Sequence, residues 1–242
     1  LFFLDSDDVI TPDCIETLVE IAERTQAEMT ISQLECEELE TGKKSIAIKI
    51  NSDKDVIEGN DNILREFSKG NLVTYAVNKL FIVDYLRQNK LYFVKGLFAQ
   101  DELWTFHLVL KMNKIALHKG ITYTYFLHAK SVIHNRTKRN FDNWFTIGQH
   151  IDQELRKQKG ERRNLILKYL VDYETLTLQM NWKAQQNEEL WKESHRNYQT
   201  LSSLGIMDYF SSEFSKETKK KAIKLALPTS LAMWLFKKQY YG

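Results

Sequence analysis

The sequence predicts an α/β domain followed by an all-α region. Over residues 1–137, short apolar runs alternate with segments of helical periodicity, which is the pattern of strands connected by helices. From about Asn140 onward the periodicity is helical almost throughout. Only 2 Pro and 9 Gly occur among 242 residues, and this favours long regular elements over a many-turned β-sandwich. We therefore predict one domain over residues 1–137 and a helical appendage over 138–242.

The chain opens on an apolar run, Leu1–Leu4, that predicts a buried parallel strand with acids at its carboxyl end. Because such a strand needs neighbours on both sides, we expect the fold to begin upstream of Leu1. The further strands expected in the first domain are 29–32, 45–50, 91–94, 115–118 and 122–127. The helices expected there are about 11–25, 61–67, 82–88 and 101–112. The helices expected in the appendage are 141–157, 161–185, 188–204 and 216–227, with a short continuation over 231–236.

The composition and the charge distribution limit the function classes. Hydrophobic residues at 43% and charged residues at 27% are typical of a globular protein, and no run of eighteen apolar residues indicates a membrane span. Two cysteines allow at most one disulfide and favour a reducing compartment, so we expect a cytoplasmic location. Residues 1–135 hold 15 basic and 20 acidic side chains, whereas residues 136–242 hold 19 and 12. This asymmetry predicts two modules with different partners.

The segment Asp5-Ser6-Asp7-Asp8 carries the first candidate site. Ligands of open α/β sheets bind beyond the carboxyl ends of strands, and side chains at i and i+2 of an extended segment point the same way. Asp5 and Asp7 are therefore expected to converge on one target, and two oxygen ligands suit Mg²⁺ or Mn²⁺. The alternative is an acidic helix N-terminus, in which Asp8 or Thr11 caps the helix and the other acids are solvated.

Two families begin with similar strings. An apolar strand followed by Asp5-x-Asp7 matches the opening of haloacid-dehalogenase-type phosphatases, which would make Asp5 a nucleophile and Asp7 an acid/base, although those enzymes normally have glycine at position 8. The longer string from Phe3 to Asp8, with Pro12-Asp13 opening the next helix, more closely resembles the Asp-x-Asp motif of family 2 GT-A glycosyltransferases.

Later segments resemble the same family in the same order. The run 78–81, Asn-Lys-Leu-Phe, is similar to its Trp-Asn-Lys-Leu-Tyr segment, and 100–104, Gln-Asp-Glu-Leu-Trp, is similar to its Glu-Asp-Glu acceptor motif. Residues 122–131 resemble the Tyr-x-Tyr…Ser segment that closes the domain. Departures are Gln100 for Glu and Val77 for Trp. The resemblance covers about residues 1–135 and implies a partial GT-A, Rossmann-like domain that lacks its first, nucleotide-binding strands.

The resemblance also implies roles for single residues. Asp101 is the expected catalytic base of an inverting transfer, and Asp5 and Asp7 are expected to hold Mn²⁺ or Mg²⁺ against the donor diphosphate. Lys79 is expected to contact the donor phosphate or to pair with a nearby acid. The remaining assignments are Glu102 and Trp104 for the acceptor, with Trp104 either stacking on a sugar or lying in the core, and Asp8, His128 and His134 as weaker candidates.

The implied reaction moves a sugar from a nucleotide-diphospho-sugar, most simply a uridine diphosphate sugar, to a glycan or lipid-linked acceptor in cell-surface polysaccharide synthesis. Without the first strands, residues 1–242 alone are expected to be inactive. Residues 216–241 combine lysines, an apolar stretch and terminal tyrosines, which suits either a helix on the inner face of an anionic membrane or a helix packed on the domain. No nucleic-acid-binding signature is recognisable. The rival hypotheses are the phosphohydrolase and a non-catalytic helical interaction module.

Overall fold

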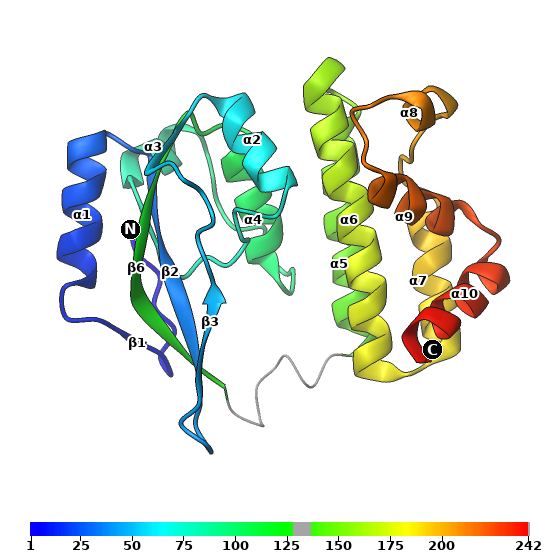
Figure 1. Ribbon diagram of the computed structural model, residues 1–242, viewed down its shortest axis with the longest axis horizontal. Coiled ribbons are helices and arrows are strands. Elements are labelled where there is room, and N and C mark those ends of the chain that lie inside the picture. The colour runs from blue at the N-terminus through cyan, green and yellow to red at the C-terminus, as the bar shows by residue number, and fades with distance from the viewer. Residues whose placement is uncertain (128–136, 242) are drawn as a thin grey trace. The chain divides into compact units, whose positions relative to one another are not determined.

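The computed structural model describes residues 1–127 and 137–241. These residues form two compact units, one holding 1–95 and 100–127 and the other holding 96–99 and 137–241. The first unit is a sheet with helices and the second is entirely helical, as Figure 1 shows. The predicted fold class, an α/β domain followed by an all-α region, is confirmed.

Two long strands form the centre of the sheet. β2 (Met29–Glu38) runs parallel to β6 (Lys114–Leu127) over its whole length, from the pair Met29/Ile115 to the pair Glu38/Leu127. The outer side of β6 pairs antiparallel with β4 (Val56–Glu58) near its start and with β1 (Val9–Ile10) near its end. The outer side of β2 pairs antiparallel with β5 (Lys79–Phe81) near its start and with β3 (Lys44–Ile48) near its end.

Helices cover both faces of this sheet. α1 (Cys14–Thr25) packs on one face, while α2 (Asn60–Ser68) and α4 (Gln100–Val109) lie together on the other, and Figure 1 shows the three layers. The short α3 (Val83–Gln88) follows β5. α4 is buried on most of its circumference, so its polar side chains with exposed surface are confined to its N-terminal end and to His107, while Thr105 is buried.

The first apolar run does not form the predicted strand. Leu1 and Leu4 are 46% and 50% exposed, and the run makes a single antiparallel bridge, between Phe2 and Leu80 of β5. The expectation of a buried parallel strand at Leu1–Leu4 was therefore wrong. The physical reason is that, among the described residues, only β5 offers this run a backbone partner, and β5 runs the other way.

Other differences concern strand boundaries. Residues 91–94 form no strand: the Leu91 carbonyl accepts a hydrogen bond from the Trp104 indole of α4, and the Phe93 ring packs against that indole. The strands predicted at 115–118 and 122–127 are one strand, β6, whose pairing register with β2 shifts between Ser32 and Leu34. The hairpin predicted at 45–50 exists as β2–β3, whereas β4 and β5 were not predicted at all.

The helical unit contains six helices within the described residues: α5 (Lys138–Leu155), α6 (Gly160–Gln185), α7 (Glu188–Tyr198), α8 (Ile206–Phe210), α9 (Lys216–Ala226) and α10 (Thr229–Tyr241). The sequence predicted all but α8. One core cluster joins α6, α7 and α10 through Leu178, Trp182, Trp191, Tyr198, Ala232 and Met233. None of the described helices is both long enough and apolar enough to cross a bilayer.

A buried acid lies in the core of the helical unit. Glu174 on α6 is 4% exposed, and its Oε1 has no hydrogen-bond partner. Burial raises the pKa of Glu174 well above its ordinary value, and the negative charge of Asp152 raises it further. A carboxyl group in this position is stabilised in its neutral form, since ionisation would leave an unpaired charge out of water.

The change Glu174→Gln is expected to stabilise the helical unit at neutral and higher pH. Because the folded state holds the Glu174 proton more tightly than the unfolded state, wild-type stability falls as the pH rises above 4.5 towards the folded-state pKa. Removing the ionisable group should add about 1–3 kcal/mol to the free energy of unfolding at pH 8 and much less at pH 5. Tryptophan fluorescence in urea reports the transition, since four of the five tryptophans belong to this unit.

The exposed Glu213→Gln is the matched control and should leave the free energy of unfolding unchanged at both pH values. A variant Glu174→Gln that is less stable than wild type at pH 8 would contradict the assignment of a neutral, unpaired carboxyl group.

Candidate functional site

Asp8 fastens the acidic turn to the sheet. Its carboxylate accepts a hydrogen bond from the Tyr123 hydroxyl at 2.6 Å and one from the Phe126 amide at 3.0 Å, and the residue is only 8% exposed. The Asp5 amide donates to the same Tyr123 oxygen at 3.2 Å. The Asp8 carboxylate therefore binds β6 inside the protein and does not face a ligand.

Asp5 and Asp7 lie on the exposed side of this turn. The pKa of Asp5 is raised, first by partial burial and then by the negative charges of Asp8 and Asp7. Three carboxylates within four residues thus repel one another, and a cation beside Asp5 and Asp7 would relieve that repulsion. This electrostatic coupling does not place the two carboxylates side by side, so the convergence of Asp5 and Asp7 on one target stays a prediction.

Asp101 occupies the first turn of α4. It is half-buried, and its Oδ1 accepts a hydrogen bond from the Glu102 amide at 3.1 Å. Burial raises the pKa of Asp101, its backbone hydrogen bonds and the charge of Lys79 oppose that shift, and the charge of Asp5 adds to it. The pKa of Asp101 therefore depends on the charges of both Lys79 and Asp5. These three residues are far apart in the sequence but share one electrostatic environment.

Lys79 is fully buried on β5. Its ammonium donates to the Tyr75 carbonyl and, at 3.1 Å, to the Asn78 side-chain oxygen. Desolvation lowers the pKa of Lys79 to about 7, and the charge of Asp101 acts in the opposite direction. Lys79 has no surface on which a phosphate could rest, which disfavours the predicted phosphate contact. Its hydrogen bonds go to a carbonyl and an amide oxygen, and the nearby acid Asp101 acts on it through its charge.

Asn78 forms the backbone turn that directs the Lys79 side chain into the core. It adopts a left-handed conformation with φ of 59° and is completely buried. Its side-chain amide donates to the Ser32 carbonyl, while its own carbonyl accepts from the Ser32 amide at 3.1 Å. The Asn-Lys pair is thus locked to β2, which sets where the Lys79 side chain enters the core.

Glu102 and its neighbours tie α4 to the segment before β5. The Glu102 carboxylate accepts from the Thr74 hydroxyl at 2.6 Å, and the Thr105 hydroxyl donates to the Thr74 carbonyl at 2.8 Å. Tyr75, next in the chain, is 52% exposed, and desolvation and then the charge of Asp101 raise the pKa of its phenol. The sequence analysis missed Tyr75, since no recognised motif includes it and only the fold brings it beside Asp101.

The assignment of Trp104 to an acceptor sugar is corrected. Trp104 is 2% exposed, and its indole N–H donates to the Leu91 carbonyl at 3.1 Å. Its ring centroid lies 4.5 Å from that of Phe93, 4.9 Å from that of Phe81 and 5.5 Å from that of Phe3. The indole belongs to an aromatic core and offers no open face for stacking.

Two weaker candidates, His128 and His134, lie outside the described residues, as does Ser131. Within residues 1–127 and 137–241, no group of three or more His, Cys, Asp or Glu side chains is arranged to hold a metal ion. A metal at Asp5 and Asp7 would therefore take further ligands from water or substrate phosphates, which is the usual arrangement for Mg²⁺.

Comparison with known proteins identifies the first part of the chain. No curated protein matches the sequence. Residues 1–89 match the family model described as Glycosyl transferase family 2, and this stretch contains the acidic turn, β2 and the Asn78-Lys79 turn. The match gives no support to the phosphohydrolase or to a purely structural module. The match supports a family 2 glycosyltransferase domain that includes residues 1–89.

Proposed function

We propose that the α/β unit transfers a sugar, with inversion, from a nucleotide-diphospho-sugar to a glycan or lipid-linked acceptor. The observation that carries the proposal is the electrostatic coupling of Asp101 with Asp5 and Lys79, because it puts a carboxyl group of raised pKa beside the acidic turn. The family of residues 1–89 supports the same class of reaction. A uridine diphosphate sugar is the proposed donor.

Asp101 is the proposed catalytic base. In an inverting transfer the acceptor hydroxyl attacks the anomeric carbon from the face opposite the leaving group, and a carboxylate on that side takes its proton. A carboxyl group whose pKa is raised by burial is a stronger base than a solvated one, so the half-buried position at the start of α4 suits this role. Proton transfer of this kind typically contributes about 10²–10⁴-fold to the rate.

Asp5 and Asp7 are the proposed ligands of Mn²⁺ or Mg²⁺. They fit such an ion because they are hard oxygen donors that repel each other, and because Asp8, the third acid of the turn, already binds β6. When bound, a divalent ion would neutralise negative charge on the leaving diphosphate.

Lys79 is better assigned as a positioning residue than as a donor ligand. Its ammonium is buried on the side of Asp101, and a positive charge there favours the ionised, proton-accepting form of that carboxyl group. On the acceptor side, Glu102 remains a candidate through its position beside Asp101. Exposed Tyr75 takes the place of Trp104 as the ring on which a sugar can pack.

The wider role proposed is cell-surface polysaccharide synthesis, in the cytoplasm at the inner face of the cell membrane, with no nucleic-acid partner. We also propose that residues 1–242 alone are inactive. Sugar transfer by this chain without added residues would contradict that.

The first test separates the base from the metal site. Asp101→Asn should lower kcat by about 10²–10⁴-fold, since it removes the proton acceptor, while uridine diphosphate affinity in the presence of Mn²⁺ stays within a few-fold. Asp7→Asn should instead weaken nucleotide and Mn²⁺ binding together. Calorimetry with uridine diphosphate and Mn²⁺ gives the affinities, and diphosphate release from a panel of uridine diphosphate sugars gives the rates.

Asp61 is an acid at the start of α2, and Asp61→Asn is the matched control. It should change neither kcat nor the affinity for uridine diphosphate and Mn²⁺. Rates and affinities are measured on the full-length protein. Loss of nucleotide affinity in Asp101→Asn as large as in Asp7→Asn, or near-normal turnover, would remove Asp101 from the role of base.

The second test concerns the charge of Lys79. In protein labelled with ¹³C at lysine Cε, one resonance should titrate near pH 7, well below the ordinary range of a lysine, and Lys79→Met should abolish that resonance. Because the folded-state pKa is below the unfolded-state value, this group makes the protein more stable as the pH rises from 7 towards 10.5. A Lys79 resonance that titrates with the exposed lysines would refute the buried position.

The same variant tests the coupling to Asp101. Without the cation, the pKa of Asp101 should rise further, so the acid limb of the pH–rate profile should move to higher pH in Lys79→Met. Lys69→Met, which removes an exposed lysine from the end of α2, should leave the profile unchanged.

A further inference from the structure

One end of the helical unit concentrates positive charge. The junction between α5 and α6, residues 156–163, has five Lys or Arg side chains and a single Glu. Figure 1 shows α8 at the same end of the unit, beside the N-terminal end of α6. We call residues 156–163 and 206–210 together the basic–apolar tip.

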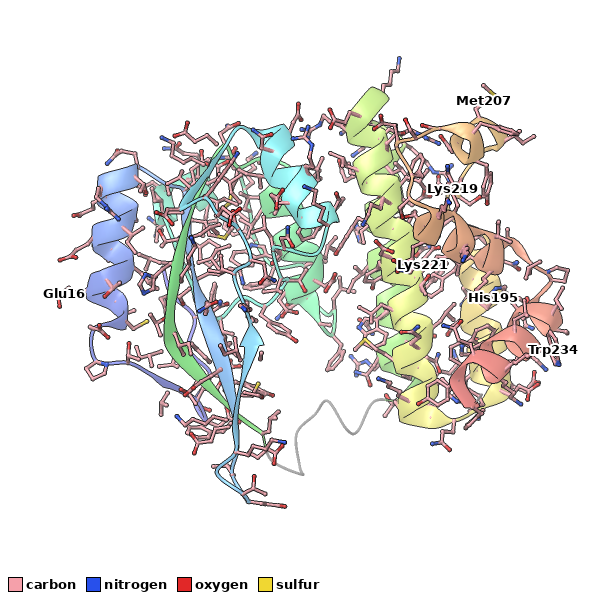
Figure 2. The ribbon with its side chains drawn as sticks, in the orientation of Figure 1. Glu16, His195, Met207, Lys219, Lys221 and Trp234 are labelled. Atoms are coloured by element: carbon pink, nitrogen blue, oxygen red, sulfur yellow. The ribbon has the colours of Figure 1, made fainter. Side chains whose placement is uncertain are left out.

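The apolar half of this tip is α8. Ile206, Met207 and Phe210 are 80%, 80% and 83% exposed, which makes them the most exposed large hydrophobic side chains in the described parts of the chain. Figure 2 shows Met207 projecting from α8 away from the other helices. Helices of globular proteins normally turn their apolar residues towards the core, so three such residues turned outward on one short helix indicate a contact surface.

The outward orientation of α8 is built into the fold. Asp208, on its inner side, accepts hydrogen bonds from the Arg163 guanidinium at 2.7 Å and 2.8 Å and from the Gly205 amide at 2.9 Å. Leu204 before the helix and Phe214 after it are 6% and 2% exposed and anchor both ends in the core. The three apolar side chains are therefore displayed by a fixed helix.

A basic hollow adjoins this helix. It has a volume of about 520 Å³, and Arg156, Lys159 and Arg163 line it together with Ser202 and Ser203. Arg156 pairs with the buried Asp152 at 2.8 Å and Arg163 pairs with Asp208, so these two cations are held in place. Lys159 is exposed, and Lys157 pairs with Glu154 at the surface, where ion pairs are weak, so these two lysines can turn to other anions at little cost.

We propose that the basic–apolar tip binds the surface of an anionic lipid bilayer. Ile206, Met207 and Phe210 enter the boundary between headgroups and acyl chains, and the cations of 156–163 lie against lipid phosphates. Charge complementarity favours this occupant over a neutral surface. The proposal concerns the helical unit alone and does not depend on sugar transfer.

The tip differs from the membrane contact predicted at residues 216–241. Ala232 and Met233 of α10 are buried in the core cluster, and Phe236 packs against it. Lys221 pairs with Asp172 and Glu217, and Lys237 pairs with Glu188. Much of the apolar and basic character of that segment is thus used inside the unit, whereas that of α8 is displayed.

Co-sedimentation with vesicles of phosphatidylcholine containing about 30% phosphatidylglycerol tests the proposal, with pure phosphatidylcholine as the neutral surface. The triple variant Ile206→Ser, Met207→Ser, Phe210→Ser should lower the partition coefficient at least about tenfold. The variant Lys157→Gln, Lys159→Gln, Arg162→Gln should lower it about tenfold at low salt and much less at high salt. Leu231→Ser with Trp234→Ser removes apolar groups of α10 that are 44% and 58% exposed, and it should change the partition coefficient less than about twofold.

Thermal melts check that all variants are folded, which their exposed positions favour. Wild-type protein that does not bind the anionic vesicles overturns the proposal, and so does equal binding to the neutral vesicles. Loss of binding in the α10 variant with retention in the α8 variant would move the contact to residues 216–241. Self-association of the wild type that the α8 variant abolishes, without vesicle binding, would make the tip an interface between copies of the chain.

Discussion

The parallel pairing of β2 with β6 is the constraint on which the candidate catalytic site depends. Near its start β2 also holds β5, in the register Ile31/Lys79, and this places Lys79 in the core. At its far end β6 carries Tyr123, whose hydroxyl binds Asp8 and so fixes the acidic turn. A shift of β5 or β6 by a single residue against β2 would turn the side chain of Lys79 or of Tyr123 to the opposite face of the sheet. The positions of Lys79 and of the acidic turn are thus properties of strand register rather than of local sequence.

A buried cation is costly unless the protein compensates for it. The Lys79 ammonium is bound by a carbonyl and a side-chain oxygen, both from the turn that precedes it, yet its pKa still falls to about 7. Replacing such a group by an apolar residue often leaves a protein as stable or more stable, so stability alone does not explain its presence. Its electrostatic influence on Asp101 does offer an explanation, because the charge of each residue opposes the pKa shift that burial causes in the other.

The sequence predicted the periodic elements well and the short ones poorly. The long helices and the β2–β3 hairpin were recognisable because many residues repeat one pattern. The strands β4 and β5 have three residues each, too few for any periodicity, and pairing with β6 and β2 creates them. Leu1–Leu4 looked like a buried strand because apolar composition does not show direction or partners.

The residues of the candidate site were likewise predictable only in part. Asp5, Asp7 and Asp101 were predicted by resemblance to a family, and the structure brings Asp5 and Asp101 into one electrostatic environment. That Asp8 and Lys79 point inward could not be predicted, because both depend on contacts with residues more than forty positions away: Tyr123 for Asp8 and the β2 register for Lys79. Trp104 was ambiguous for a related reason, since an indole near a catalytic acid is equally suited to a sugar and to an aromatic core.

The two apolar and basic segments of the helical unit show why composition does not determine which surface meets a membrane. Residues 216–241 have the more obvious sequence signature, but the sequence cannot tell that α10 completes a core with α6 and α7. The short α8 has only five residues and no detectable periodicity, so it was not predicted, yet Arg163 and Asp208 fix it with its apolar side outward. What decides between the two segments is whether their apolar side chains already have partners within the unit. For α10 many do, and for α8 three of them do not.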